Sequence, residues 1–186
     1  MDVFDAIRGR RSIKRFTDRP ISRDEIEKIL AAAALAPNHR LTEPWRFYVL
    51  GPDARYAYGL ALGDRKARKL IDPEAVAALR AKVAAEHRAL PCMIAVAMVT
   101  SDDPEIREED YAAVMMAIQN LALVAVDIGL GTHIKTGAVM LSAAARAAVG
   151  VPEDQRIISI INLGEPSEVP PPKSRREGRE HTTWLP

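Results

Sequence analysis

Apolar residues recur at helical spacing along much of the chain. In ISRDEIEKILAAAALAP, residues 21–37, isoleucine, leucine and alanine return every three or four positions, which predicts an amphipathic helix. Ser22 and Glu25 form a capping box at its start, and Pro37 ends it. Comparable patterns predict helices over residues 3–9, 54–64, 73–89, 105–129 and 142–150.

Strand patterns lie between these helices. WRFYVL (45–50) alternates and is rich in aromatic side chains, as half-buried strands are. CMIAVAMVT (92–100) and RIISIINLG (156–164) are apolar runs with the length of buried strands, and GTHIKTG (131–137) is a short loop or strand. This order predicts an α+β fold, a single domain over residues 1–186, with helical layers around a small sheet.

Residues 105–129 form the longest predicted helix. Its acidic start, EIREED, suits the positive end of a helix dipole. Its later part is apolar on all sides, so we expect it in the interior or in a subunit interface. Gln119 and Asn120 interrupt the apolar run, which argues against a membrane span.

The net charge of the chain is only +1, which argues against a general nucleic-acid-binding protein. The charge is uneven, however. Residues 1–19 carry six Lys or Arg against three Asp, and residues 170–186 carry four Lys or Arg against two Glu. Two basic ends of this kind could meet at one anion.

Cysteine and histidine usage narrows the chemistry further. The single cysteine, Cys92, excludes a disulfide within the chain and lies in an apolar run, as a buried core thiol does. The four histidines are far apart in the sequence, so no metal site is predicted. The N-terminus has no apolar core of signal-peptide length, and we therefore expect a cytoplasmic protein.

The sequence RRSIKRF, residues 10–16, here called the basic segment, has the side chains that bind a phosphate monoester. Such a group is held by an arginine fork, a second cation and a hydroxyl or backbone N–H donor. Arg10, Ser12 and Lys14 alternate, so in an extended segment they point to one side. Arg11 and Arg15 then point to the other. The alternative is a solvated basic turn after a helix C-terminus.

Three other stretches admit both a binding role and a structural one. PKSRR (172–176) either closes the same anion site or forms a solvated tail. APNHRLTEPWRF (36–47) offers polar and aromatic side chains to a ligand, or is a capped helix end before an edge strand. GLGTHIKTG (129–137) lets a backbone approach a flat ligand, or is a helix stop and a turn. The usual glycine loops for nucleotides and the nucleophile elbow are absent.

Taken together, in this order and spacing, the four stretches resemble the FMN-dependent nitroreductase family. The matching motifs are R-x-S-x-[KR]-x-[FY] at 10–16, A-P-x-x-x-x-x-x-P-W-x-[FV] at 36–47, G-[LF]-G-[ST] at 129–132 and L-G-x-P at 163–166. The resemblance implies a three-layer sandwich with a small, mostly antiparallel sheet. It also implies an intertwined homodimer with FMN in its interface and exchanged C-terminal arms, about residues 165–186.

The resemblance further implies a set of FMN contacts. Arg11 would contact the flavin ring or its edge, and either Arg11 or Lys135 would stabilise the anionic reduced flavin. No residue is assigned as a catalytic acid or base. The phosphate and ribityl chain would be bound by Arg10, Ser12, Lys14, Lys173 and Arg175, the partner subunit would supply Leu35, Asn38 and His39, and the isoalloxazine ring would be lined by Ile134, Lys135 and Thr136.

The implied activity is NAD(P)H-dependent reduction of nitroaromatic, quinone or related electron-poor small molecules by a ping-pong mechanism. Another reaction of the same superfamily is an alternative, such as enone reduction, reductive dehalogenation or flavin fragmentation. A third hypothesis is a non-enzymatic module that binds an acidic partner or RNA, which needs exposed aromatic side chains among the basic residues. Only Phe16 meets that condition, so we expect no nucleic-acid binding, and the interrupted apolar run at 111–126 predicts no membrane binding.

Overall fold

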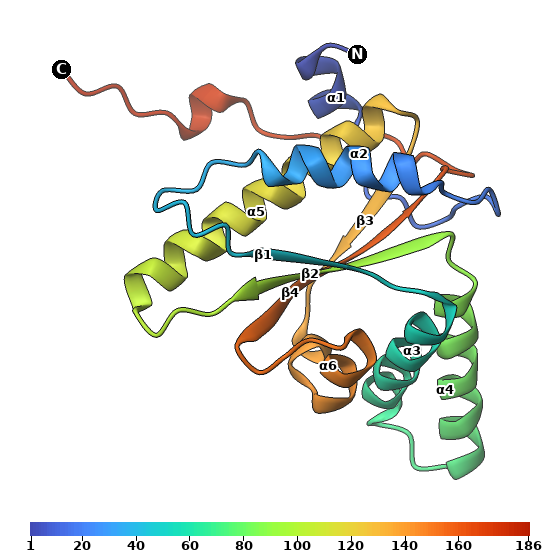
Figure 1. Ribbon diagram of the computed structural model, residues 1–186. Helices are drawn as coiled ribbons and strands as arrows, with labels where there is room; N and C mark the ends of the chain where they lie inside the picture. The colour runs from blue at the N-terminus through green and yellow to red at the C-terminus, as the bar shows by residue number, and fades with distance from the viewer.

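The computed structural model describes residues 1–186, which fold into helices on both faces of one sheet (Figure 1). The α-helices are α1 (Val3–Gly9), α2 (Arg23–Ala34), α3 (Pro52–Ala67), α4 (Pro73–Arg88), α5 (Pro104–Asp127) and α6 (Ala143–Val149). The strands are β1 (Trp45–Val49), β2 (Cys92–Val99), β3 (Gly131–Lys135) and β4 (Gln155–Gly164), and two short 3-10 helices are η1 (Ala138–Leu141) and η2 (Gly178–His181). The predicted α+β class and the predicted helices and strands are confirmed, with ends that differ by less than one helical turn.

The sheet has four strands in the order β1-β2-β4-β3, and every neighbouring pair is antiparallel. Helices α1, α2 and α5 lie on one side of it, and α3, α4 and α6 on the other (Figure 1). Strand β3 is an edge strand, so one side of its backbone is open to other groups.

Strand β2 explains why the central apolar run does not alternate with polar residues. Every second residue from Cys92 to Met98 packs into the cluster under α2 and α5, and the residues between them, from Met93 to Ala97, pack into the cluster with α3 and α6. Both faces of the strand are therefore buried. Each fully buried aliphatic side chain contributes about 1.5–3 kcal/mol to folding.

Helix α5 crosses the face of the sheet as one continuous helix. Its core-facing side includes Val114, Ile118 and Leu121, all buried. Asn120 does not break the helix; its amide donates to the carbonyl of Ala32 in α2 (3.2 Å). By length and composition α5 could cross a membrane, and 44% of its most apolar window is buried inside the protein. Tyr111 remains exposed on its outer side.

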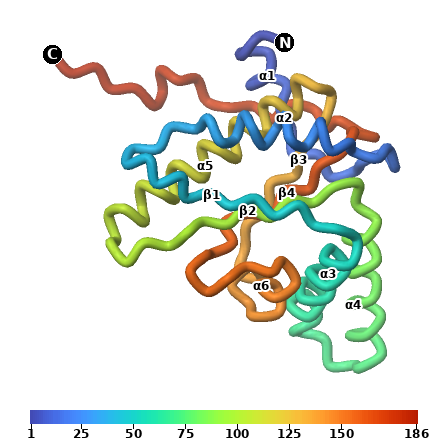
Figure 2. The backbone as a smooth tube through the Cα atoms, in the orientation of Figure 1, coloured from blue at the N-terminus to red at the C-terminus, as the bar shows by residue number.

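Both chain ends leave apolar side chains in solvent. The last segment extends away from the body of the protein, and Trp184 is 89% exposed (Figure 2). Apolar groups such as Trp184 and Leu185 usually pack against other groups, but within one chain both stay exposed. The apolar face predicted for α1 is likewise exposed, at Val3 and Phe4.

Candidate functional site

The basic segment is fixed to the sheet at two points. The N–H of Ile13 donates to the carbonyl of Thr132 (2.9 Å), and Ser12 forms a parallel bridge with Thr132 at the start of β3. Phe16 forms a second bridge with Pro166, just after β4. Backbone contacts thus hold this segment in place and leave the side chains of Arg10, Ser12 and Lys14 free for other partners.

Two glycines allow the basic segment to lie close to strands β3 and β4. Gly131 and Gly164 face each other in the β3–β4 register, and the side chains of Ile13 and Phe16 pack on them. A Cβ atom on Gly164 would lie 2.8 Å from the Phe16 ring, and one on Gly131 would overlap Ile13. Ile13 is only 3% exposed. The apolar members of the segment therefore anchor it.

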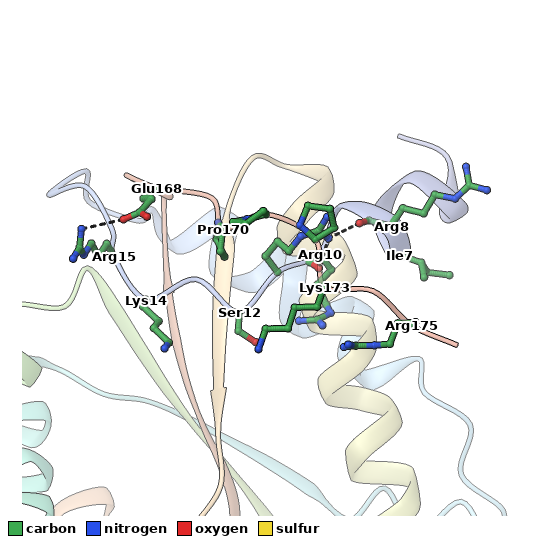
Figure 3. A pocket seen from close by; sticks show the side chains of 13 residues that line it. Ile7, Arg8, Arg10, Ser12, Lys14, Arg15, Glu168, Pro170, Lys173 and Arg175 are labelled. Atoms are coloured by element: carbon green, nitrogen blue, oxygen red, sulfur yellow. Dashed lines mark hydrogen bonds and ion pairs between the residues drawn. The ribbon is translucent and has the colours of Figure 1, made fainter. Parts of the chain in front are cut away.

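A cavity of about 950 Å³ opens beside the basic segment. The end of α1, the basic segment and the proline-rich stretch after β4 form its walls, so residues from both ends of the chain meet there (Figure 3). Its lining residues are Ile7, Arg8, Arg10, Arg11, Ser12, Lys14, Arg15, Glu168, Pro170, Pro171, Pro172, Lys173 and Arg175.

Most of the positive charge in this cavity has no acidic partner. The one lining carboxylate, Glu168, is bound by Arg15 at 3.0 Å. No carboxylate lies within 4.0 Å of the charged groups of Arg10, Lys14, Lys173 or Arg175. Clustered cations without counter-charges favour the binding of an anion. The sequence prediction that the two basic ends meet at one site is consistent with this geometry.

The predicted alternation within the segment is wrong in one respect. Arg11 and Arg15 line the same cavity as Arg10 and Lys14, because the segment begins at the cap of α1 and is not a flat strand. The guanidinium of Arg11 donates to the carbonyl oxygens of Arg8 and Arg10, and its Nε is buried without a partner.

Strand β3 carries a second set of predicted residues along the edge of the same sheet. Ile134 packs against the α2–α5 cluster, and Thr136 follows the strand in solvent. Lys135 is half-buried, and burial, followed by the charge of Lys66, lowers the pKa of its ammonium. Burial, and then the charges of Lys135 and Lys14, lower the pKa of His133.

The remaining predicted residues lie elsewhere in the chain. Leu35 caps α2 and is 83% exposed. Asn38 and His39 line a separate cavity of about 420 Å³, together with Glu109 and Met116 of α5. None of the three lines the basic cavity of its own chain. That the partner subunit supplies them stays a prediction.

Sequence reasoning missed several lining residues. Arg8 belongs to α1, and Pro170 to a stretch that composition marks only as non-helical. Glu168 gave no local signal, because its role depends on a contact with Arg15, 153 positions away. The triple proline could have been recognised as a rigid wall beside PKSRR, since proline fixes its own backbone.

Cys92 behaves as the sequence predicted. It is 3% exposed, and burial raises the pKa of its thiol to about 11. Such a thiol is not nucleophilic. The structure brings together no group of three or more His, Cys, Asp or Glu residues that could hold a metal ion.

The α+β fold places an open cationic cavity beside the edge strand of its sheet, which makes the cavity a candidate binding site for an anion. A family model described as the nitroreductase family matches residues 7–165. The chain belongs to the nitroreductase family.

Individual relatives agree over nearly the whole length. A Bacillus subtilis protein provisionally described as NAD(P)H nitroreductase YfhC is 31% identical over 184 residues, 97% of this chain and 93% of that protein. The solved structure of a nitroreductase-like family protein from Bacillus cereus has a TM-score of 0.85 and 28% identity, and the match covers 100% of this chain and 96% of that chain. A Desulfovibrio desulfuricans protein, provisionally described as a nitroreductase and solved in complex with FMN, has a TM-score of 0.72 at 28% identity over 99% of this chain and 96% of that chain.

Proposed function

We propose that this protein is an FMN-dependent oxidoreductase that uses NAD(P)H to reduce nitroaromatic, quinone or related electron-poor molecules. The observation that carries the proposal is the set of unpaired cations in the basic cavity. A phosphate monoester matches it in charge and in donor type. Membership of the nitroreductase family, and the FMN complex of the Desulfovibrio relative, supply the identity of the ligand.

The residues present fit the phosphate and ribityl part of FMN. Arg10 offers a planar fork, Ser12 a hydroxyl and Lys14 a point charge, all from one anchored segment. Lys173 and Arg175 reach the same cavity from the tail. The orphaned Nε of Arg11 is a further buried donor in need of an acceptor. These groups would bind and orient the cofactor without any movement of the sheet.

The open edge of β3 is the proposed place for the flavin ring. Ile134 gives this region an apolar surface, and Thr136 a hydroxyl beyond the strand. Lys135 would favour negative charge on the nearby ring, and its partial burial weakens screening of that charge by water. When bound, FMN supplies the hydride-accepting and electron-donating chemistry that protein side chains lack.

We further propose that two copies complete each site. One chain would supply the basic cavity and β3, and the other Leu35, Asn38 and His39, which lie outside the cavity of their own chain. Exposed apolar groups at both chain ends, Phe4 and Trp184 among them, support burial against a partner and exchange of the C-terminal arms. The donor and the acceptor would then use one cavity in turn, which predicts ping-pong kinetics in a cytoplasmic homodimer.

The decisive measurement is the visible spectrum of the purified protein, before and after anaerobic addition of NADH or NADPH. A flavin band that bleaches with either donor supports the proposal. A protein that stays colourless after incubation with FMN excludes it. Parallel lines in double-reciprocal plots against NAD(P)H at several acceptor concentrations would support the ping-pong order.

The phosphate contacts are tested by a double substitution, Arg10→Ala with Lys14→Ala. Each charge-assisted hydrogen bond is worth about 1.5–3 kcal/mol, so the Kd for FMN should rise at least 100-fold or so, while the melting temperature without FMN stays unchanged. Arg176→Ala is the matched control, because Arg176 neighbours Arg175 but does not line the cavity. Full retention of FMN by the double variant would refute the phosphate assignment.

A further inference from the structure

The side chain of His39 contacts a carboxylate of helix α5. The Nδ1 atom of His39 lies 2.9 Å from Oε1 of Glu109. Arg40 donates from Nε to the other oxygen, Oε2, of the same carboxylate at 2.8 Å, and from its terminal nitrogen to Glu105 at 3.0 Å. Both oxygens of Glu109 are therefore occupied by donors from consecutive residues of the loop.

The loop that carries His39 has a fixed shape. Leu41 and Glu43 have φ angles of 50° and 45°, in the left-handed region that non-glycine residues adopt at a cost of about 1–2 kcal/mol each. Asn38 accepts the N–H of Glu43 at 2.8 Å, and the hydroxyl of Thr42 is hydrogen-bonded to the buried Asp110. Such strained residues persist where surrounding contacts over-determine the backbone.

The contacts of Glu109 decide which nitrogen of His39 carries the proton. Hydrogen bonds from His39 and then Arg40 lower the pKa of Glu109, so its carboxyl stays ionised and can only accept. The facing Nδ1 must then carry a hydrogen. In the neutral ring this leaves a lone pair on Nε2, and the side chain is 71% exposed, so that lone pair is available to a ligand.

We infer that Glu109 is a positioning residue that holds His39 as its Nδ1–H tautomer and makes Nε2 a hydrogen-bond acceptor toward the neighbouring subunit's flavin. The inference rests on the proposed function, since it takes His39 to a flavin site shared between two chains. The only N–H group of the oxidised isoalloxazine ring is at N3. FMN therefore offers this acceptor two kinds of donor, that imide N–H and the hydroxyls of the ribityl chain.

The test compares Glu109→Gln with Glu105→Gln. A glutamine at 109 has one acceptor oxygen for two donors, and Arg40 can only donate. The oxygen must serve Arg40, and the amide NH₂ then faces His39 and favours the Nε2–H tautomer. Glu105 lies on the same helix as Glu109 and also accepts from Arg40. Glu105→Gln removes that negative charge and leaves the contact between His39 and Glu109 intact, so it is the matched control.

The first readout is the ¹⁵N chemical shifts of His39 in the FMN-free protein, recorded with the imidazole ring neutral. We expect the Nδ1–H form in the wild type and in Glu105→Gln, and the Nε2–H form in Glu109→Gln. The second readout is the Kd for FMN, which should rise about fivefold in Glu109→Gln alone, as expected for the loss of one hydrogen bond. Circular dichroism shows whether each variant is folded.

The possible outcomes test the role of Glu109 and the contact between His39 and the flavin separately. An unchanged tautomer in folded Glu109→Gln would overturn the role of Glu109. A changed tautomer with unchanged FMN affinity would overturn the contact between His39 and the flavin. A wild-type protein that binds no FMN would instead defeat the proposed function, and the tautomer, measured without FMN, would still report on Glu109.

Discussion

The basic cavity and the loop at residues 38–43 use charge in opposite ways. In the cavity, Arg10 and Lys14 have no acidic partner, and backbone bridges and buried apolar side chains hold their segment. In the loop, His39 and Arg40 are paired with carboxylates of α5. Charges left unpaired are available to a ligand, whereas charges paired within the protein fix a shape.

The two regions therefore differ in whether the same residues both stabilise the fold and bind the ligand. In the cavity, the anchors of the segment are Ile13 and Phe16, and the groups offered to a ligand are other residues. In the loop, the polar side chains hold the backbone and also carry the predicted ligand contact. Substitutions of the unpaired cations in the cavity should therefore change binding without changing the fold. Substitutions of the cavity's anchors, or of the polar residues of the loop, should change both.

The anchor of the cavity should give the largest change in stability. Gly131→Ala would place a methyl group against Ile13, and such overpacking lowers the free energy of unfolding by about 1–3 kcal/mol. For a chain of this size, the melting temperature falls by roughly 2–4 °C per kcal/mol. FMN affinity should fall with it, because the displaced segment carries Ser12 and Lys14. Thermal unfolding and FMN titration measure both.

The matched control for this substitution is Gly178→Ala, where a methyl group meets nothing within 4 Å. A double-mutant cycle sharpens the result. In an Ile13→Ala background, the additional destabilisation by Gly131→Ala should shrink, because the opposing side chain is gone. If Gly131→Ala is as stable as Gly178→Ala, the segment is not anchored at this point.

The loop should respond to the loss of one hydroxyl. Thr42→Val leaves the buried carboxylate of Asp110 without its partner, which costs about 1–3 kcal/mol. Urea unfolding measures the change, with Thr183→Val in the exposed tail as control. FMN affinity should also fall in Thr42→Val, since the hydroxyl supports the loop that carries His39. Lower stability with unchanged affinity would place His39 outside the binding site.

The contrast also explains which features the sequence could predict. The basic segment can be predicted from the sequence because its binding groups and its anchors, Ile13 and Phe16, are neighbours in the chain. Strand β2 can be predicted because both of its faces are buried and its residues are therefore uniformly apolar. Local patterns of this kind are set by burial along one element.

Other features depend on contacts that no local pattern encodes. Glu109 lies 70 positions from His39 and was predicted only as part of an acidic helix start. The inward turn of Arg11 depends on how the segment leaves α1. The exposed face of α1 reads as an ordinary amphipathic pattern, and the pattern alone does not say whether its own chain or a partner covers it.

The smallest expected effect concerns the strained backbone of the loop. Glycine adopts a positive φ without the steric penalty of a side chain, so Leu41→Gly removes strain at a residue that is 82% exposed. Glycine also loses more entropy on folding, and the net gain in the free energy of unfolding should be about 0.5 kcal/mol. Leu185→Gly, in the exposed tail and without a positive φ, should give no gain when compared by urea unfolding. If Leu41→Gly is more stable and binds FMN with unchanged affinity, the hydrogen bonds of the loop are sufficient to fix its shape. If it binds FMN more weakly, the restricted backbone of residue 41 also helps to hold His39 in place.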